Sequence, residues 1–172
     1  MIVPGDNPFW AFSLGAYRKP GVAEACLRLQ DGAGADVNLL LYFCWVAGVR
    51  AGALDRAEVG EAVACTEAWR DGVVGPLRAV RRRMKEGIAG VPAESVEALR
   101  GEVKRIELQS ERLQQDLLYR LSGGSSSEAA GGPDARRRAE ENITLYLDLI
   151  RSPRSPQVTR DCRAVIGASL PD

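Results

Sequence analysis

Four polar residues lie close together where one predicted helix ends and the most apolar helix of the chain begins. They are Gln30, Asp31, Asp36 and Asn38, in the stretch LQDGAGADVNLLLYFCW. The free N–H groups of a helix N-terminus favour polar partners, so this set could form a pocket for a hydroxylated ligand. Because two of the four are carboxylates, a magnesium ion or a cationic partner fits better than an anion. The alternative is structural: Asp31 precedes a helix-ending glycine, Asp36 is the next N-cap, and Asn38 bonds nearby backbone.

A second candidate site is a basic helix face. Helical spacing places Arg78, Arg82 and Lys85 on one side of a predicted helix, with Arg81 at the edge of that side. This face could be solvated and paired with glutamates of the long helix that follows. It could instead dock an acidic partner or a phosphate group. Arg78 and Arg82 are therefore binding candidates beside the polar set.

Several chemistries are excluded by residue type. The chain has no histidine, which excludes Ser-His-Asp and Cys-His catalysis and the common zinc and non-haem iron ligand sets. No C-x-x-C pair occurs, so we expect reduced thiols rather than a metal or disulfide role for the four cysteines, Cys26, Cys44, Cys65 and Cys162. Phosphate-loop and dinucleotide-binding glycine motifs are also absent. We therefore expect no metal and no cofactor, and favour a protein that is not an enzyme.

Composition indicates one ordinary domain with a hydrophobic core. The 172 residues are 45% apolar and 27% charged, and the formal net charge is zero. Basic and acidic residues also balance within residues 1–56, 57–121 and 122–172, so nucleic acid is an unlikely partner. The longest apolar run, residues 37–49, is shorter than the ~20 residues of a membrane-spanning helix, and no signal peptide is recognisable. We expect a cytoplasmic protein.

Helix signals dominate the chain, and period-2 strand patterns are almost absent. Asn7 and Pro8 predict the start of a first helix, and a second is expected from Pro20 to just before Gly32. The next, residues 36–51, is apolar almost all round, which is typical of a central helix surrounded by others. A D-x-x-E capping box, Asp55 and Glu58, predicts the following helix.

The second half of the chain carries an interrupted helix, a long helix and a linker. Gly72, Gly75 and Pro76 predict a kink or break, after which Leu77, Val80 and Met84 share one side of a helix. The long helix, residues 93–121, is one arm of an antiparallel pair or an ordinary bundle helix. Its apolar stripe is expected to comprise Val96, Leu99, Val103, Ile106, Leu113 and Leu117. Residues 123–133 have the composition of a flexible linker, and two helices are expected within residues 134–172.

The first forty residues or so resemble the signature of a proteobacterial family of unknown function. The pattern is F-W-x-F-S-x-x-x-Y followed by C-L-x-L-Q-D-x-x-G-x-D-V-N-L-L-L-F-x-x-W. Here it falls on Phe9, Trp10, Phe12, Ser13, Tyr17, Cys26, Leu27, Leu29, Gln30, Asp31, Gly34, Asp36, Val37, Asn38, Leu39, Leu40, Leu41 and Trp45. The resemblance implies a bacterial, cytoplasmic, helical protein and transfers no catalytic residue.

Together these patterns predict an all-α protein, a single bundle of about six helices around a buried central helix. Residues 1–122 would form the main domain, 123–133 the linker, and 134–172 C-terminal helices that pack back on it. The first function hypothesis is a protein-interaction or adaptor module that contacts a protein partner or a second copy of itself. A small-molecule binder or enzyme built on Gln30, Asp31, Asp36 and Asn38 is the alternative. An RNA- or ribosome-associated factor that acts through the arginine face is a weaker one.

Overall fold

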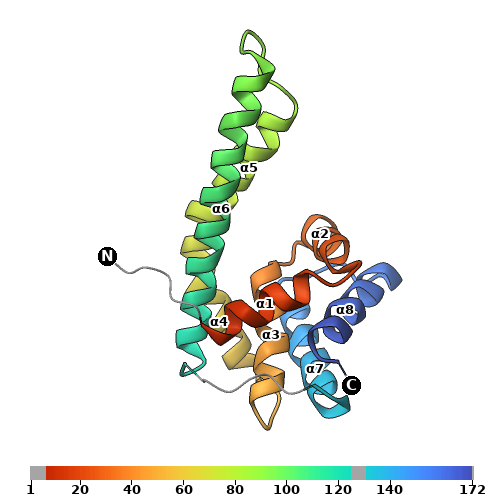
Figure 1. Cartoon of the computed structure of the whole chain (residues 1–172). Helices are drawn as coiled ribbons and strands as arrows, with labels where there is room; N and C mark the ends of the chain where they lie inside the picture. The colour runs from red at the N-terminus through yellow and green to blue at the C-terminus, as the bar shows by residue number, and fades with distance from the viewer. Residues whose placement is uncertain (1–6, 125–130, 172) are drawn as a thin grey trace.

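The computed structural model describes residues 7–124 and 131–171, which form an all-α fold with no strand (Figure 1). Counting α4, a π-helical segment and α5 as one continuous helix gives seven helices in these residues, close to the predicted number of about six. The elements in order are α1 (Pro8–Tyr17), α2 (Val22–Ala33), α3 (Val37–Val49), α4 (Arg56–Trp69), η1 (Arg70–Val74), α5 (Gly75–Lys85), α6 (Ala93–Leu121), α7 (Pro133–Leu149) and α8 (Pro156–Ser169).

Helix α3 is the hub of the fold, as predicted. It contacts α1, α2, α6, α7 and α8, and every residue from Asn38 to Ala47 is buried. The Trp45 ring lies 5.4 Å from Phe9 and 5.8 Å from Tyr119, measured between ring centroids, and Leu40 and Phe43 are fully buried. A helix that is apolar on all sides is stable in water only when neighbouring helices enclose it. Here α1, α2, α7, α8 and the second half of α6 enclose α3.

Local capping explains where α1 and α4 begin. The side chains of Asn7 and Asp55 accept from backbone N–H groups at the starts of α1 and α4, and Asp55 and Glu58 form the predicted capping box. The prediction for α2 was wrong by about one helical half-turn at each end. The helix begins at Val22 and ends at Ala33, because the left-handed conformation that ends it is adopted by Gly34, with φ +67°, rather than by Gly32.

The predicted kink or break after α4 is a π-helical turn that keeps the helix continuous. Pro76 has no N–H to donate to the carbonyl four residues earlier. The backbone widens instead, so that the N–H of Gly75 donates to the carbonyl of Arg70. A side chain on Gly75 would place Cβ 3.2 Å from that same carbonyl oxygen, which explains a glycine at this turn.

Helix α5 and the first half of α6 project from the other helices as a two-helix arm (Figure 1). The predicted apolar stripes on this arm are partly wrong. Leu99 is 58% exposed and Ile106 44% exposed, and Val80 on α5 is half exposed. The buried residues of α6 are instead mainly polar: Val96, Glu107, Ser110, Gln114, Gln115 and Leu118. Helix bounds were therefore predictable where the identity of the buried face was not.

The C-terminal helices lie against the body, where α7 contacts α3 and α8 contacts α2. Most of the predicted linker, residues 125–130, lies outside the described residues. All four cysteines are free thiols. Within the described residues, no single helix has the length and apolar character needed to cross a membrane. Helices α2 and α3 together meet that requirement, but they are bent by 119° relative to one another.

Candidate functional site

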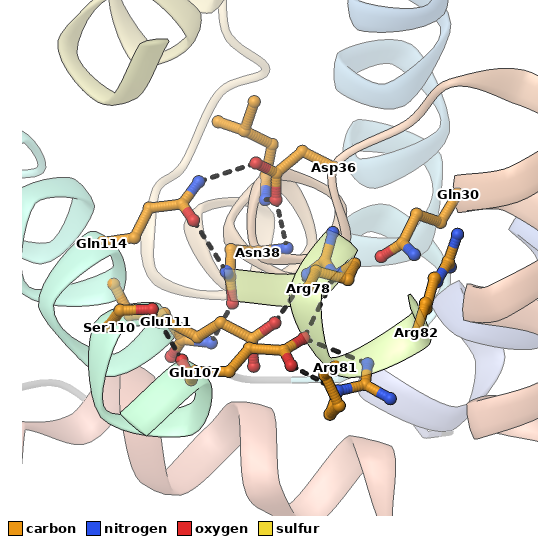
Figure 2. Close-up of polar contacts among 12 residues, drawn as sticks. Gln30, Asp36, Asn38, Arg78, Arg81, Arg82, Glu107, Ser110, Glu111 and Gln114 are labelled. Carbon is orange, nitrogen blue, oxygen red and sulfur yellow. Dashed lines mark hydrogen bonds and ion pairs between the residues drawn. The ribbon is translucent and has the colours of Figure 1, made fainter. Parts of the chain in front are cut away.

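Asp36 and Asn38 lie at the start of α3 and face the base of α6. The Oδ1 atom of Asp36 accepts from the backbone N–H of Asn38 at 2.8 Å and caps α3. Its Oδ2 atom accepts from Gln114 Nε2 at 2.7 Å, and Gln114 Oε1 accepts from Asn38 Nδ2 at 3.0 Å (Figure 2). Asn38 Oδ1 in turn accepts from Gln115 Nε2 at 2.8 Å. We call these four side chains, Asp36, Gln114, Asn38 and Gln115, the amide relay.

The other two residues of the predicted polar set lie apart from the relay. Asp31 is exposed and accepts from Arg82 Nη2 at 2.7 Å. That hydrogen bond lowers the pKa of Asp31. Gln30 is half-buried beside Asp31 and turns toward the space between α2 and α5 (Figure 2). The set predicted as one cluster therefore divides into half-buried Asp36 with buried Asn38 on one side and exposed Asp31 on the other.

Two arginines of α5 bind two glutamates on successive turns of α6. Arg78 donates from Nε to Glu107 at 3.2 Å and from Nη2 to Glu111 at 2.6 Å. Arg81 donates to both carboxylate oxygens of Glu107 (Figure 2). This confirms the predicted pairing of the arginine face with the long helix for Arg78 and Arg81, whereas Arg82 pairs with α2 instead. The ion pairs of Arg78 and Arg81 hold α5 against α6 near the base of the arm, and that of Arg82 joins the arm to α2.

The two glutamates respond in opposite ways to the same surroundings. Burial alone would raise the pKa of Glu107, but the hydrogen bonds and charges of Arg81 and Arg78 outweigh burial and hold it below the ordinary value. Burial also raises the pKa of Glu111, and its contacts with Arg78 only partly offset that effect, so this pKa stays above the ordinary value. The site thus has one firmly ionised carboxylate and one that holds its proton more readily.

A cavity of about 310 Å³ lies between these polar groups and the apolar side chains of α1 and α2. Its apolar wall comprises Trp10, Leu14, Tyr17, Leu27, Val37, Leu41 and Leu108. Its polar wall comprises Ser13, Gln30, Asn38, Arg78, Arg81, Lys104, Glu107, Glu111 and Gln115. The α6 residues in these walls run from 104 to 115, about 16 Å along the helix axis. Such a cavity suits an elongated, mainly apolar molecule.

Two buried polar atoms in the cavity wall have no hydrogen-bond partner among the described residues. They are Ser13 Oγ and Gln115 Oε1, and each side chain is only 3% exposed. A helical serine commonly bonds the carbonyl one turn earlier, but Ser13 does not. Buried polar groups are rarely left without a partner, because an unmade hydrogen bond costs about 1–3 kcal/mol. Both atoms are therefore candidates to bind a ligand.

The sequence pointed to part of this site. Gln30, Asn38 and Arg78 line the cavity, whereas Asp31, Asp36 and Arg82 do not. The residues missed were the polar ones on the buried face of α6, above all Glu107, Gln114 and Gln115. The signal available for them was the pair of adjacent glutamines at a position in a long helix where an apolar stripe was expected.

The described residues hold no cluster of three or more Cys, Asp or Glu side chains suited to a metal ion. A second, smaller cavity of about 190 Å³ lies between α7 and α8 and includes Thr144, Thr159 and Cys162 in its wall. Burial raises the pKa of the Cys162 thiol to about 11, which keeps it protonated and unreactive near neutral pH. The first cavity is the stronger candidate site.

No curated protein and no solved structure matches the chain. The sequence profile of one family, described as Protein of unknown function (DUF2390), matches residues 8–118. This match covers α1 to α6 almost completely, including every residue of the cavity wall and of the amide relay. The chain therefore belongs to this family of proteins of unknown function.

Proposed function

We propose that this protein binds a small, mainly apolar molecule in the cavity between α1, α2, α3 and the base of the arm. The observation that supports this most strongly is the pair of buried, unpartnered polar atoms, Ser13 Oγ and Gln115 Oε1, in the wall of a cavity whose surface is mainly apolar. Small-molecule sites are mainly apolar, with a few polar groups that fix the orientation of the ligand. The surface of this cavity is likewise mainly apolar, although its wall also includes charged side chains.

The alternative that the two polar atoms are only packing defects has a specific weakness. Both lie in the same cavity wall although they are about a hundred residues apart in sequence. The amide relay also keeps Gln115 fixed, because its Nε2 donates to Asn38. Fixing this side chain in one orientation lowers the entropy cost of binding a ligand at its unpaired oxygen.

Binding can be tested with N-phenyl-1-naphthylamine, an apolar dye whose emission rises in apolar sites. Leu14 is half-buried in the cavity wall, so Leu14→Trp should fill the cavity without creating a void elsewhere. The matched control is Thr144→Trp, which places the same side chain in the wall of the second cavity.

The wild type and Thr144→Trp should bind the dye with the same affinity. Leu14→Trp should bind it at least about tenfold more weakly, a loss of 1.4 kcal/mol. Circular dichroism should show equal helix content in the three proteins. Equal dye binding by wild type and Leu14→Trp, or no binding by wild type, would contradict the proposal.

The arm supports a second candidate, docking of an acidic protein partner. Residues 75–106 carry eight Lys or Arg and four Glu, although the whole chain is neutral. Exposed apolar side chains accompany this charge, including Val80, Val91 and Leu99. Exposed apolar groups flanked by basic ones are typical of surfaces that bind acidic partners, and the basic charge argues against pairing of two arms with one another.

Poly-L-glutamate is a suitable acidic probe of the arm. Binding should weaken as salt rises, and the triple variant Arg82→Glu, Arg83→Glu, Lys85→Glu should abolish it. Variants at the exposed arginines Arg137, Arg151 and Arg163 in α7, the loop after it and α8 provide the control. Binding that is independent of salt, equal in both sets of variants, or replaced by preferential binding of RNA would count against an acidic protein partner. A bacterial, cytoplasmic setting stays a prediction.

A further inference from the structure

The amide relay has a direction, and Asp36 sets it. A carboxylate oxygen can only accept hydrogen bonds, whereas a primary amide has one oxygen that accepts and one nitrogen that donates. Both oxygens of Asp36 are occupied, Oδ1 by backbone N–H groups of α3 and Oδ2 by Gln114. Gln114 must therefore turn its nitrogen to Asp36, which leaves its oxygen for the next member.

The same reasoning fixes each following side chain. Because Gln114 presents its oxygen, Asn38 must turn its nitrogen to it, at 3.0 Å. Because Asn38 then presents its oxygen, Gln115 must donate from Nε2, at 2.8 Å. The end of the relay is therefore Gln115 Oε1, an acceptor. Asp36 does not line the cavity itself, but its charge decides which atom of Gln115 is left for a ligand.

From this we infer that the cavity selects a ligand that donates a hydrogen bond to Gln115 Oε1, and that Asp36 determines this preference through the relay. The inference rests on the proposed function and adds the chemical class: an uncharged apolar ring or chain compound that carries a hydroxyl or N–H group. Ser13 Oγ, also buried and unpartnered, can accept from the same group or donate to it.

The inference also says which ligands are disfavoured. A molecule whose buried end is a carboxylate, an ether or a ring nitrogen without a proton would place its lone pairs against those of Gln115. At Gln115 such a pairing leaves two acceptors without a donor, and Gln115 Oε1 is buried. Near the other end of the cavity, Lys104 has no ion pair among the described residues, so an acidic group is tolerated only there.

Three probes with one bicyclic frame test the inference: naphthalene, 2-naphthol and quinoline. Naphthalene has no polar group, 2-naphthol has an O–H donor, and quinoline has a ring nitrogen that can only accept. Affinities come from displacement of N-phenyl-1-naphthylamine in mildly alkaline buffer, where quinoline is unprotonated and 2-naphthol still holds its proton. Wild type should bind 2-naphthol about fivefold to tenfold more tightly than quinoline, with naphthalene between them.

Asp36→Asn is the decisive variant. Asparagine keeps an oxygen that caps α3, but it places an N–H donor where Oδ2 accepted from Gln114. Every amide of the relay must then reverse, so that Gln115 presents its nitrogen to the cavity. The ratio of 2-naphthol affinity to quinoline affinity should fall by at least about fivefold. Asp55→Asn is the matched control, since Asp55 caps α4 outside the cavity, and it should leave the ratio at the wild-type value.

Gln115→Met gives a second measurement, which decides the matter if Asp36→Asn does not fold. Methionine removes the terminal acceptor at nearly constant volume. The ratio of 2-naphthol affinity to naphthalene affinity should therefore fall below the wild-type value, with Ser13 Oγ as the remaining partner of the hydroxyl. Two results overturn the inference but leave the proposed function standing. One is that wild type binds the dye but binds all three probes with equal affinity. The other is that neither variant changes the preference for 2-naphthol over the other probes. Absence of dye binding overturns the proposed function itself.

Discussion

Helices α3 and α6 are both buried in part, but they bury opposite kinds of side chain. Helix α3 is enclosed on all sides and buries aromatic and aliphatic groups from Leu39 to Ala47. Helix α6 buries one face only, and at its centre this face consists of Glu107, Ser110, Gln114 and Gln115. Apolar burial stabilises without regard to direction, whereas each polar group on α6 needs a particular partner in a particular orientation. The first helix therefore holds the fold together, and the second shapes a site.

The largest expected effect is at the apolar hub. Trp45→Ala removes a fully buried ring from contact with Phe9 and Tyr119. The free energy of unfolding should fall by about 4 kcal/mol because transfer and cavity terms add. Urea unfolding followed by circular dichroism measures it. Trp10 is half-buried in the cavity wall, so Trp10→Ala should lower the free energy of unfolding clearly less. An equal loss in the two variants would show that α3 is no more important for stability than the cavity wall.

A smaller effect is expected at the polar face of α6. Glu107→Leu leaves Arg81 without a carboxylate and removes one of the two partners of Arg78. The free energy of unfolding should fall by about 2 kcal/mol, and amide hydrogen exchange in α5 should accelerate because α5 loses part of its attachment to α6. Glu102→Leu, which removes only an exposed ion pair with Arg105 on the same helix, is the control. Equal loss of stability in both variants would mean that the ion pairs of Glu107 contribute no more than an exposed one.

The two glutamates should also differ in their pH dependence. The pKa of Glu107 is lowered on folding, so its contribution is complete above about pH 4.5 and is lost as the pH falls through the lowered value. The pKa of Glu111 is raised, so its charge costs stability at neutral pH, and that cost disappears as the pH falls toward the raised value.

Urea midpoints measured between about pH 7 and pH 5 test whether the pKa of Glu111 is raised or lowered on folding. Since the chain has no histidine, few other side chains titrate there. Wild type should gain stability relative to Glu111→Gln as the pH falls, by less than about 1 kcal/mol. A relative loss would show that the pKa of Glu111 is lowered, not raised.

The smallest effect is expected for an ion pair on the surface of the arm. Arg100 donates to Glu97 one turn away, and Glu97 is well exposed. Arg100→Ala should leave the urea midpoint close to that of the wild type, because such pairs are screened by water and salt. A loss comparable to that of Glu107→Leu would show that stability depends on charge along all of α6 rather than at its buried face.

The starts of α1, α3 and α4 and the central position of α3 could be predicted because their causes are local. Asn7, Asp36 and Asp55 cap backbone groups within three residues of themselves, and the composition of α3 leaves it no exposed face. The buried face of α6 could not be predicted in this way. Its polar residues are satisfied by partners far away in sequence, such as Asn38 for Gln115 and Arg78 for Glu107.

In the candidate site, too, the features with local causes could be predicted and those that depend on distant partners could not. Gln30 and Asn38 were singled out because they flank a helix junction, and both line the cavity. Asp31 was grouped with them by sequence proximity, but its partner Arg82 lies outside the cavity wall. Sequence proximity cannot show which side of a junction a side chain faces, since this depends on where α5 and α6 pack.

The most direct measurement is a ¹H–¹⁵N NMR titration of the protein with 2-naphthol, followed at the side-chain amides of Asn38, Gln114 and Gln115. A ligand that completes the end of the relay should shift the Gln115 signals most and those of Asn38 and Gln114 progressively less. The backbone signals of α7 and α8 should stay in place. Unmoved side-chain amides, or shifts concentrated beside Thr144 and Thr159, would show that the polar face of α6 does not form a binding site.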